Sequence, residues 1–245
     1  YQREGIYPTP TPFMLGREGA GVVLAVGPDV GGVTAVEGVA VGDRVAWPFA
    51  DGSAASHVCI PADRLVTIPE GVDLESLLPV AVRSHLLSAD GEPEHRRIAV
   101  AFVQFSGTDA LLRDEGPEAL ADALDECMRN VQEATLRNGV TFFETDINRD
   151  GGKVMLTAGA PASLGNDEER MLRATRRIVE RIGRLPVRVG VNCGPVFAGD
   201  FGPDFRRTYS VKGDAINLAA RGMGKAAPGQ ALATVEAVDA AVNHV

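Results

Sequence analysis

The pattern of apolar residues changes near residue 80, and this change limits the folds open to the chain. Before it, short apolar runs such as GVVLAVG and DRVAW alternate with glycine and proline turn signals, as is typical of β-strands. After it come an apolar run at 98–105, a long helical pattern and two further strand-like runs. We therefore expect a β-rich first half and a second half that combines helices with strands.

Two long helices are predicted in the second half. The first begins at Pro117, which suits a first helical position, and ends near residue 138, where Gly139 supplies a stop. The second follows Asn166, which precedes a glutamate at capping-box spacing, and ends at Gly183. Both carry an apolar stripe, so each is expected to pack one face on a core.

A polar stretch separates the two halves. Ser88–Arg97 reads SADGEPEHRR and contains the glycine and proline of a linker, whereas Leu77–Leu87 is apolar enough for a short helix. We predict a β domain at 1–78, a linker at 79–97 and a second domain at 98–245.

Composition disfavours several classes of partner and site. A net charge of -9 argues against nucleic acid or an anionic membrane as partner. Three cysteines without a CxxC pair indicate neither a disulfide framework nor a thiolate zinc site. No apolar run approaches the ~20 residues of a membrane span, and the N-terminus lacks the order of a signal peptide. We therefore expect a cytoplasmic protein without a membrane span.

The segment YSVKGDAINLAARG, residues 209–222, predicts a strand, a glycine turn and a helix. Asn217 and Arg221 are four residues apart, so they share one helical face near the N-terminus of that helix. An amide, a guanidinium and the positive end of a helix dipole together suit a polyphosphate. The residues alone also allow an ordinary exposed arginine and a helix-start asparagine.

Four segments, in order, resemble the catalytic domain of class III adenylate and guanylate cyclases. They are FVQFSGTDALL, TAGAP, VRVGVNCGPVFAGDFG and YSVKGDAINLAARG, and the resemblance covers roughly residues 95–235. It implies the α+β class with a ferredoxin-like βαββαβ core. It also implies head-to-tail pairing, as a homodimer or a heterodimer, and cyclic nucleotide formation from ATP or GTP with release of pyrophosphate, as part of intracellular signalling.

The same resemblance assigns roles to three residues of YSVKGDAINLAARG. Asn217 takes the position that orients the ribose, and Arg221 takes the position that binds phosphate. Ser210 stands where an adenylate-selective member carries an aspartate that reads the base. A hydroxyl both donates and accepts, so Ser210 does not choose between adenine and guanine.

The metal positions depart from the family pattern. The two aspartates that hold Mg²⁺ or Mn²⁺ fall at Gln104 and Gly152, and the base-recognising lysine falls near Asn148. Such a centre works largely by charge, and its cations are held through carboxylates. We expect a degenerate domain, weak or inactive as a homodimer. Whether the chain is an enzyme stays open, because a non-catalytic nucleotide-binding or dimerisation module is the alternative.

The hairpin segment DINRDGG leaves Asp146 and Asp150 as candidates for holding a metal ion. The segment also matches the opening of an EF-hand loop, but the twelfth position is Thr157 rather than a bidentate glutamate, and strands replace the helices. A calcium site is therefore not expected. An Asp-Gly hairpin turn that binds nothing is the other interpretation.

The first half resembles part of a different enzyme. YPTPTPFMLGREGAGVVLAVGPDV, VGDRVAW and IPADRLVTIPEGVD are similar to the GroES-like N-terminal domain of zinc-independent quinone oxidoreductases, in the medium-chain dehydrogenase/reductase superfamily. Arg17 stands where the zinc alcohol dehydrogenases carry histidine, so no zinc is expected. After residue 76 no strand leads into a G-x-G-x-x-G fingerprint, so an NADPH-dependent oxidoreductase is only the runner-up among enzyme functions.

Overall fold

The computed structural model describes residues 19–27, 39–47, 56–72, 82, 84–85, 93–181, 183–201 and 208–242. The chain divides into two compact units, Tyr1–Leu74 and Glu75–Val245, and each is described by itself. Most of the predicted linker lies outside the described residues, as does Arg17. No helix in the described part of the chain has both the length and the apolar character that a membrane crossing requires.

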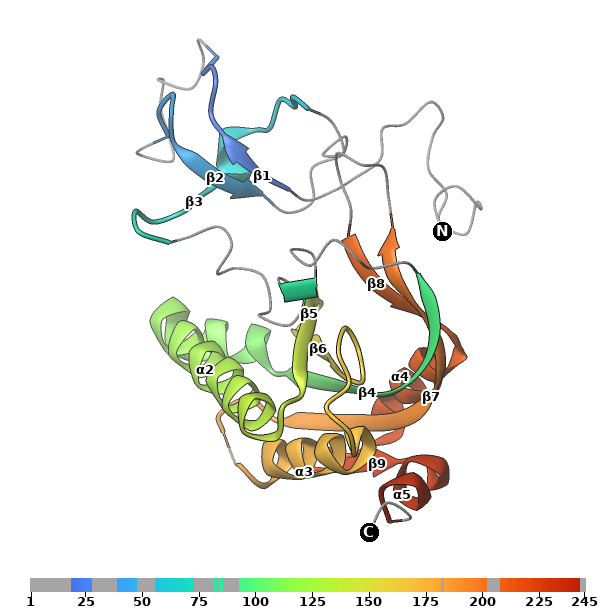
Figure 1. Ribbon diagram of the computed structural model, residues 1–245. Coiled ribbons are helices and arrows are strands. Elements are labelled where there is room, and N and C mark those ends of the chain that lie inside the picture. Colours follow the sequence, from blue (N-terminus) through green and yellow to red (C-terminus); the bar gives the residue numbers. More distant parts are fainter. Residues whose placement is uncertain are drawn as a thin grey trace, which may run out of the picture. The chain divides into compact units, whose positions relative to one another are not determined.

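The first unit holds a small antiparallel sheet of the order β1-β2-β3 (Figure 1). Its strands are β1 (Gly19–Val22), β2 (Arg44–Trp47) and β3 (Val66–Thr67), with a short 3₁₀ helix, η2 (Ala62–Arg64), before β3. The side chain of Trp47 is buried over Gly19, where an added Cβ would lie 2.7 Å from the Trp47 ring. The β-rich character predicted for this half is confirmed.

The second unit is built on a sheet of the order β5-β6-β4-β7-β8, with β9 parallel to β7 and all other neighbours antiparallel (Figure 1). The elements are β4 (Glu94–Ser106), α2 (Thr108–Asn138), β5 (Thr141–Asn148), β6 (Gly151–Ala158), α3 (Asp167–Glu180), β7 (Val187–Phe201), β8 (Thr208–Lys212), α4 (Asp214–Lys225), β9 (Ala231–Ala233) and α5 (Val235–Val242). The order from β4 to β7 is the predicted βαββαβ core.

Apolar side chains cover both faces of this sheet because its central strand, β4, is apolar at successive positions. Ala99, Ala101 and Val103 pack with residues of α2, α3 and α5. The alternate residues Ile98, Val100 and Phe102 point to the other face and pack with residues of β8 and α4. The strand is thus buried on both sides, and the sheet separates two helical layers.

The helix boundaries differ in part from those predicted. Gly116, at φ 90° and ψ 178°, breaks α2 directly before Pro117, so the predicted helix is the second part of a longer element. Gly139 ends it in the left-handed conformation, as expected. Helix α3 begins directly after Asn166, as predicted, although Asn166 takes φ 50° and makes no side-chain capping bond, and the helix ends at Glu180, before Gly183.

The apolar stretch Leu77–Leu87 contributes to the second unit through its described residues, and the rest of it lies outside them. Val82 and His85 are helical, and Val82 is buried in the same cluster as β8 and α4 residues. The His85 ring meets Tyr209 edge to face at 4.4 Å, and its Nε2 lies 3.6 Å from Oδ1 of Asp200. This part of the stretch therefore packs on the end of the sheet that carries β8.

The chain leads into β4 against the hairpin of β7 and β8. A Cβ on Gly199 would lie 2.6 Å from Cα of Pro93, the residue before β4. Gly199 also pairs with Ser210 across the hairpin. Glycine at this position is what allows the two backbones to approach so closely.

Candidate nucleotide site

Helix α4 lies directly against the backbone of β7. A Cβ on Gly190 would lie 2.1 Å from the Met223 amide nitrogen and 2.2 Å from the Ala219 carbonyl oxygen, so only glycine permits this packing. Ala215 and Ala219 bury the inner side of the helix. The opposite side of α4 therefore faces away from the sheet.

Asn217 and Arg221 lie on that outer side, one helical turn apart as predicted, and both are exposed. Across the described part of the chain, no side-chain hydrogen bond or ion pair engages either residue. The amide and the guanidinium are therefore available to a ligand or to another protein.

A buried asparagine holds the start of α4 in place. Asn192 in β7 donates from Nδ2 to the carbonyl of Ala215 at 2.9 Å, and its Oδ1 accepts from the Thr234 hydroxyl at 2.8 Å. Only 3% of Asn192 is exposed. Sequence reasoning missed this residue, although a lone polar side chain in the apolar strand VGVNCG is a signal that could have identified it.

Ser210 lies in β8, half-buried, on the opposite side of the strand from Tyr209 and Val211. Tyr209 and Val211 are buried in the cluster beneath α4, and burial raises the pKa of the Tyr209 phenol. No hydrogen bond among the described residues links Ser210 with Asn217 or Arg221. The three residues belong to successive elements, β8 and α4.

Gln104, at the first metal position of the family, interacts with a positively charged side chain, that of Arg188. It pairs across the sheet with Lys153 of β6 on one side and Arg188 of β7 on the other. Arg188 donates from Nε to Oε1 of Gln104 at 2.9 Å. The position thus has a neutral amide between two basic residues.

Gly152, at the second metal position, does not converge with Gln104. It pairs with Phe105, the residue after Gln104 in β4. A side chain at position 152 would therefore project from the face of the sheet opposite to that of Gln104. An added Cβ would lie 2.6 Å from Cζ of the buried Phe105 ring and 2.8 Å from the Asp146 carbonyl oxygen. There is no room for a carboxylate unless both the Phe105 ring and the Asp146 main chain move.

Asp146 and Asp150 both have partners already. Oδ2 of Asp146 lies 3.0 Å from Nζ of Lys153. Oδ1 of Asp150 accepts from the Asp109 amide at 3.0 Å, so this carboxylate caps the start of α2. No group of three His, Cys, Asp or Glu side chains suited to a metal ion occurs within the described ranges. The residues described here therefore do not fit the divalent cations of the family.

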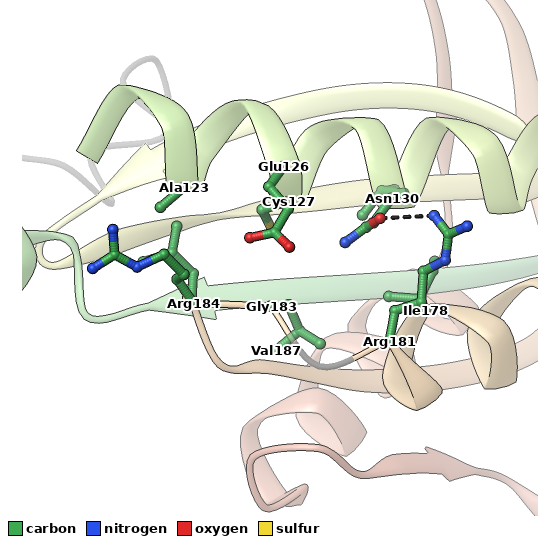
Figure 2. A pocket seen from close by; sticks show the side chains of 11 residues that line it. Ala123, Glu126, Cys127, Asn130, Ile178, Arg181, Gly183, Arg184 and Val187 are labelled. Carbon is green, nitrogen blue, oxygen red and sulfur yellow. Dashed lines mark hydrogen bonds between the residues drawn. The ribbon is translucent and has the colours of Figure 1, made fainter. Parts of the chain in front are cut away.

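A small cavity lies between α2 and the connection from α3 to β7 (Figure 2). Arg181 donates from Nη1 to Oδ1 of Asn130 at its rim, at 2.7 Å. Burial and the charge of Glu126 raise the pKa of the Cys127 thiol in its wall to about 11. Its volume of about 10 Å³ suits a single water molecule, so this cavity cannot hold a nucleotide.

Family models match both halves of the chain. The adenylate and guanylate cyclase catalytic domain matches residues 92–243. The alcohol dehydrogenase GroES-like domain matches residues 1–70. Both resemblances found in the sequence are confirmed.

Two curated relatives from Mycobacterium tuberculosis match part of the chain. The Mycobacterium tuberculosis protein Rv1318c, described as uncharacterized, is 33% identical over 156 residues, which are 60% of this chain and 28% of the relative. Rv1319c of the same organism, also described as uncharacterized, is 30% identical over 155 residues, again 60% of this chain and 28% of the relative. The chain thus spans little more than a quarter of the length of these relatives.

Solved structures of cyclases share the fold. The adenylyl cyclase CyaB from P. aeruginosa matches with a TM-score of 0.53 at 23% identity, over 62% of this chain and 83% of that structure. The guanylate cyclase domain of RhGC from Catenaria anguillulae, solved in complex with GTP, matches with a TM-score of 0.50 at 20% identity, over 60% and 83%. With the family model spanning residues 92–243 of 245, this chain belongs to the adenylate and guanylate cyclase catalytic domain family.

Proposed function

We propose that this chain is a nucleotide cyclase-type signalling domain that supplies one half of an active site, which a second cyclase domain completes. Its half consists of Asn217 and Arg221, and the partner supplies the carboxylates that hold Mg²⁺ or Mn²⁺. One observation carries the proposal: α4 presents Asn217 and Arg221 unengaged on a firmly anchored helix, while the positions of the metal carboxylates are Gln104 and Gly152.

The reaction proposed is the cyclisation of ATP or GTP. The ribose 3'-oxygen forms a bond to the α-phosphorus, the bond from that phosphorus to the leaving pyrophosphate breaks, and the 3'-hydroxyl gives its proton to solvent water. The Asn217 amide would orient the ribose, which fixes the direction of attack. The Arg221 guanidinium would bind the phosphoryl oxygens, where negative charge develops in the transition state.

A homodimer of this chain would be weak or inactive, because neither subunit would supply the carboxylates. The physiological unit is therefore a heterodimer in this proposal, located in the cytoplasm, where the free cysteines stay reduced. Purified chain incubated with ATP or GTP and either cation should produce little cyclic nucleotide by itself.

Complementation with a competent cyclase domain tests the proposal. The test partner keeps its metal aspartates, but its own asparagine and arginine, equivalent to Asn217 and Arg221, are replaced by alanine, so its homodimer is inactive. Mixing it with this chain should restore cyclic nucleotide formation, and Arg221→Ala should lower the restored rate by about 10²-fold or more.

Arg173→Ala is the matched control, since Arg173 is an exposed helical arginine of α3 whose partner, Glu169, lies on the same helix. This variant should support the full restored rate. If mixing restores no activity although the two folded domains associate, the proposed function is wrong.

A further inference from the structure

A row of three side chains crosses the sheet where the family has its metal centre. Gln104 of β4 is the direct cross-strand neighbour of Lys153 in β6 and of Arg188 in β7. The three side chains therefore project from the same face of the sheet. Adjacent strands are about 4.8 Å apart, so the backbones of the two basic residues are about 10 Å apart, with Gln104 between them. The row places positive charge where a metal centre needs negative charge.

The Arg188 guanidinium is held in place without being neutralised. Its Nε donates to Gln104 at 2.9 Å, and no carboxylate of the described residues pairs with it. Arg188 and Gln104 are both half-buried, so water screens this charge less than that of a fully exposed arginine. A fixed guanidinium with unused N–H donors suits a phosphate oxygen.

Lys153 has a partner that an incoming anion can replace. Its Nζ lies 3.0 Å from Oδ2 of Asp146, and the two side chains are 37% and 59% exposed. An ion pair this exposed is weak, so a multiply charged anion would compete successfully for the ammonium group. Asp146 then acts as a counter-charge to Lys153.

We infer that this row binds a polyphosphate chain directly, without a divalent cation. The inference deepens the proposed function and rests on it for the ligand class, a nucleoside triphosphate. It concerns the other half-site of the chain, separate from Asn217 and Arg221 on α4. Arg188 and Lys153 supply the positive charge that cations supply elsewhere in the family, and Gln104 positions Arg188.

Binding to the purified full chain in EDTA tests the inference. ATP and inorganic triphosphate should both bind, measured by calorimetry at low ionic strength, and both should bind more weakly as salt is added. Arg188→Gln and Lys153→Gln should each weaken binding about tenfold, whereas Arg173→Gln should not change it. Binding of ATP but not of inorganic triphosphate would overturn recognition through the phosphate chain, as would an absence of binding in EDTA.

Asp146→Asn gives a result of opposite sign for the two possible roles of Asp146. As a counter-charge to Lys153, its loss should tighten binding in EDTA about two- to fivefold. As a metal ligand, its loss would instead weaken a binding that requires Mg²⁺, and that result would contradict the inference.

Complementation and binding in EDTA separate the inference from the proposed function, because complementation depends on α4 and binding in EDTA depends on the row across the sheet. Normal binding without complementation in the original chain would count against the proposed function alone. Complementation without binding in EDTA would count against the polyphosphate row alone.

Discussion

Asn192 and Ala215 are joined by a buried hydrogen bond of 2.9 Å, which runs from the side-chain amide in β7 to the main-chain carbonyl in the first turn of α4. Because Asn217 is two residues further along that turn, the bond helps to determine where the Asn217 amide points. Thr234, just before α5, completes the arrangement through its hydrogen bond to Asn192. One buried side chain thus connects the sheet, α4 and the start of α5.

Replacement of Asn192 by leucine should destabilise the fold and loosen α4. The change leaves the Thr234 hydroxyl without its acceptor and removes the donor to Ala215, so we expect a loss of about 1–3 kcal/mol in the free energy of unfolding. Urea unfolding followed by circular dichroism measures this loss. The variant should also complement a partner domain less well, and unchanged stability would contradict the role given to Asn192.

Replacement of Gly190 by alanine should force α4 away from β7. The added methyl group would meet backbone atoms of Met223 and Ala219 at 2.1 and 2.2 Å, and backbone cannot move aside as a flexible side chain can. We expect a destabilisation of about 2 kcal/mol or more.

Gly224→Ala is the matched control within α4, because nothing lies within 4 Å of its added methyl group. Since alanine favours a helix over glycine, this variant should be as stable as the original chain or more stable, by up to about 1 kcal/mol. A similar loss of stability in both variants would show that close packing at Gly190 is not the cause.

Restoring both family aspartates should not create a metal-dependent cyclase. Gln104→Asp and Gly152→Asp place their carboxylates on opposite faces of the sheet, and the second one also meets the Phe105 ring. We expect Gly152→Asp to destabilise the fold by about 1–3 kcal/mol. Phe105→Leu should recover part of that loss in a double-mutant cycle, and simple additivity of the two changes would argue against the clash.

The stability of the second unit should depend on pH through Cys127. Burial, with a smaller contribution from Glu126, raises the pKa of its thiol to about 11, while the unfolded chain ionises near its ordinary value of 9.0. Below that value both states keep the proton. As pH rises toward 11, the unfolded state loses its proton first, so stability should fall by up to about 3 kcal/mol.

Comparison with Cys127→Ala isolates this effect from other groups that titrate at high pH. Urea unfolding at about pH 8 and about pH 10.5 should show a smaller fall in stability for the variant than for the original chain. Equal falls would assign the pH dependence to other groups.

Local patterns in the sequence predicted local structure well. Pro117 and Gly139 mark the long part of α2 because proline and glycine act through their own backbone preferences. Asn217 and Arg221 share a helical face because four-residue spacing in a helix ensures it. The part of α2 before Pro117, which begins at Thr108, was not predicted, since Gly116 interrupts the pattern with an extended residue at positive φ.

The contacts around Gln104 could not be predicted from local patterns. Arg188 is 84 residues away in sequence, and only the antiparallel register of β4 and β7 brings the two side chains together. The same register shows that positions 104 and 152 belong to opposite faces of the sheet. Counting positions in the sequence identified the two missing aspartates. The strand pairing shows in addition that Lys153 and Arg188 flank position 104 and that Phe105 lies opposite position 152.

The close approach of Pro93 to Gly199 ties the start of β4 to the β7–β8 hairpin, backbone against backbone. Gly199 is the cross-strand neighbour of Ser210, so any side chain added at position 199 would displace the strand segment that carries Ser210. The absence of a side chain at one residue of β7 therefore sets the position of a residue in β8.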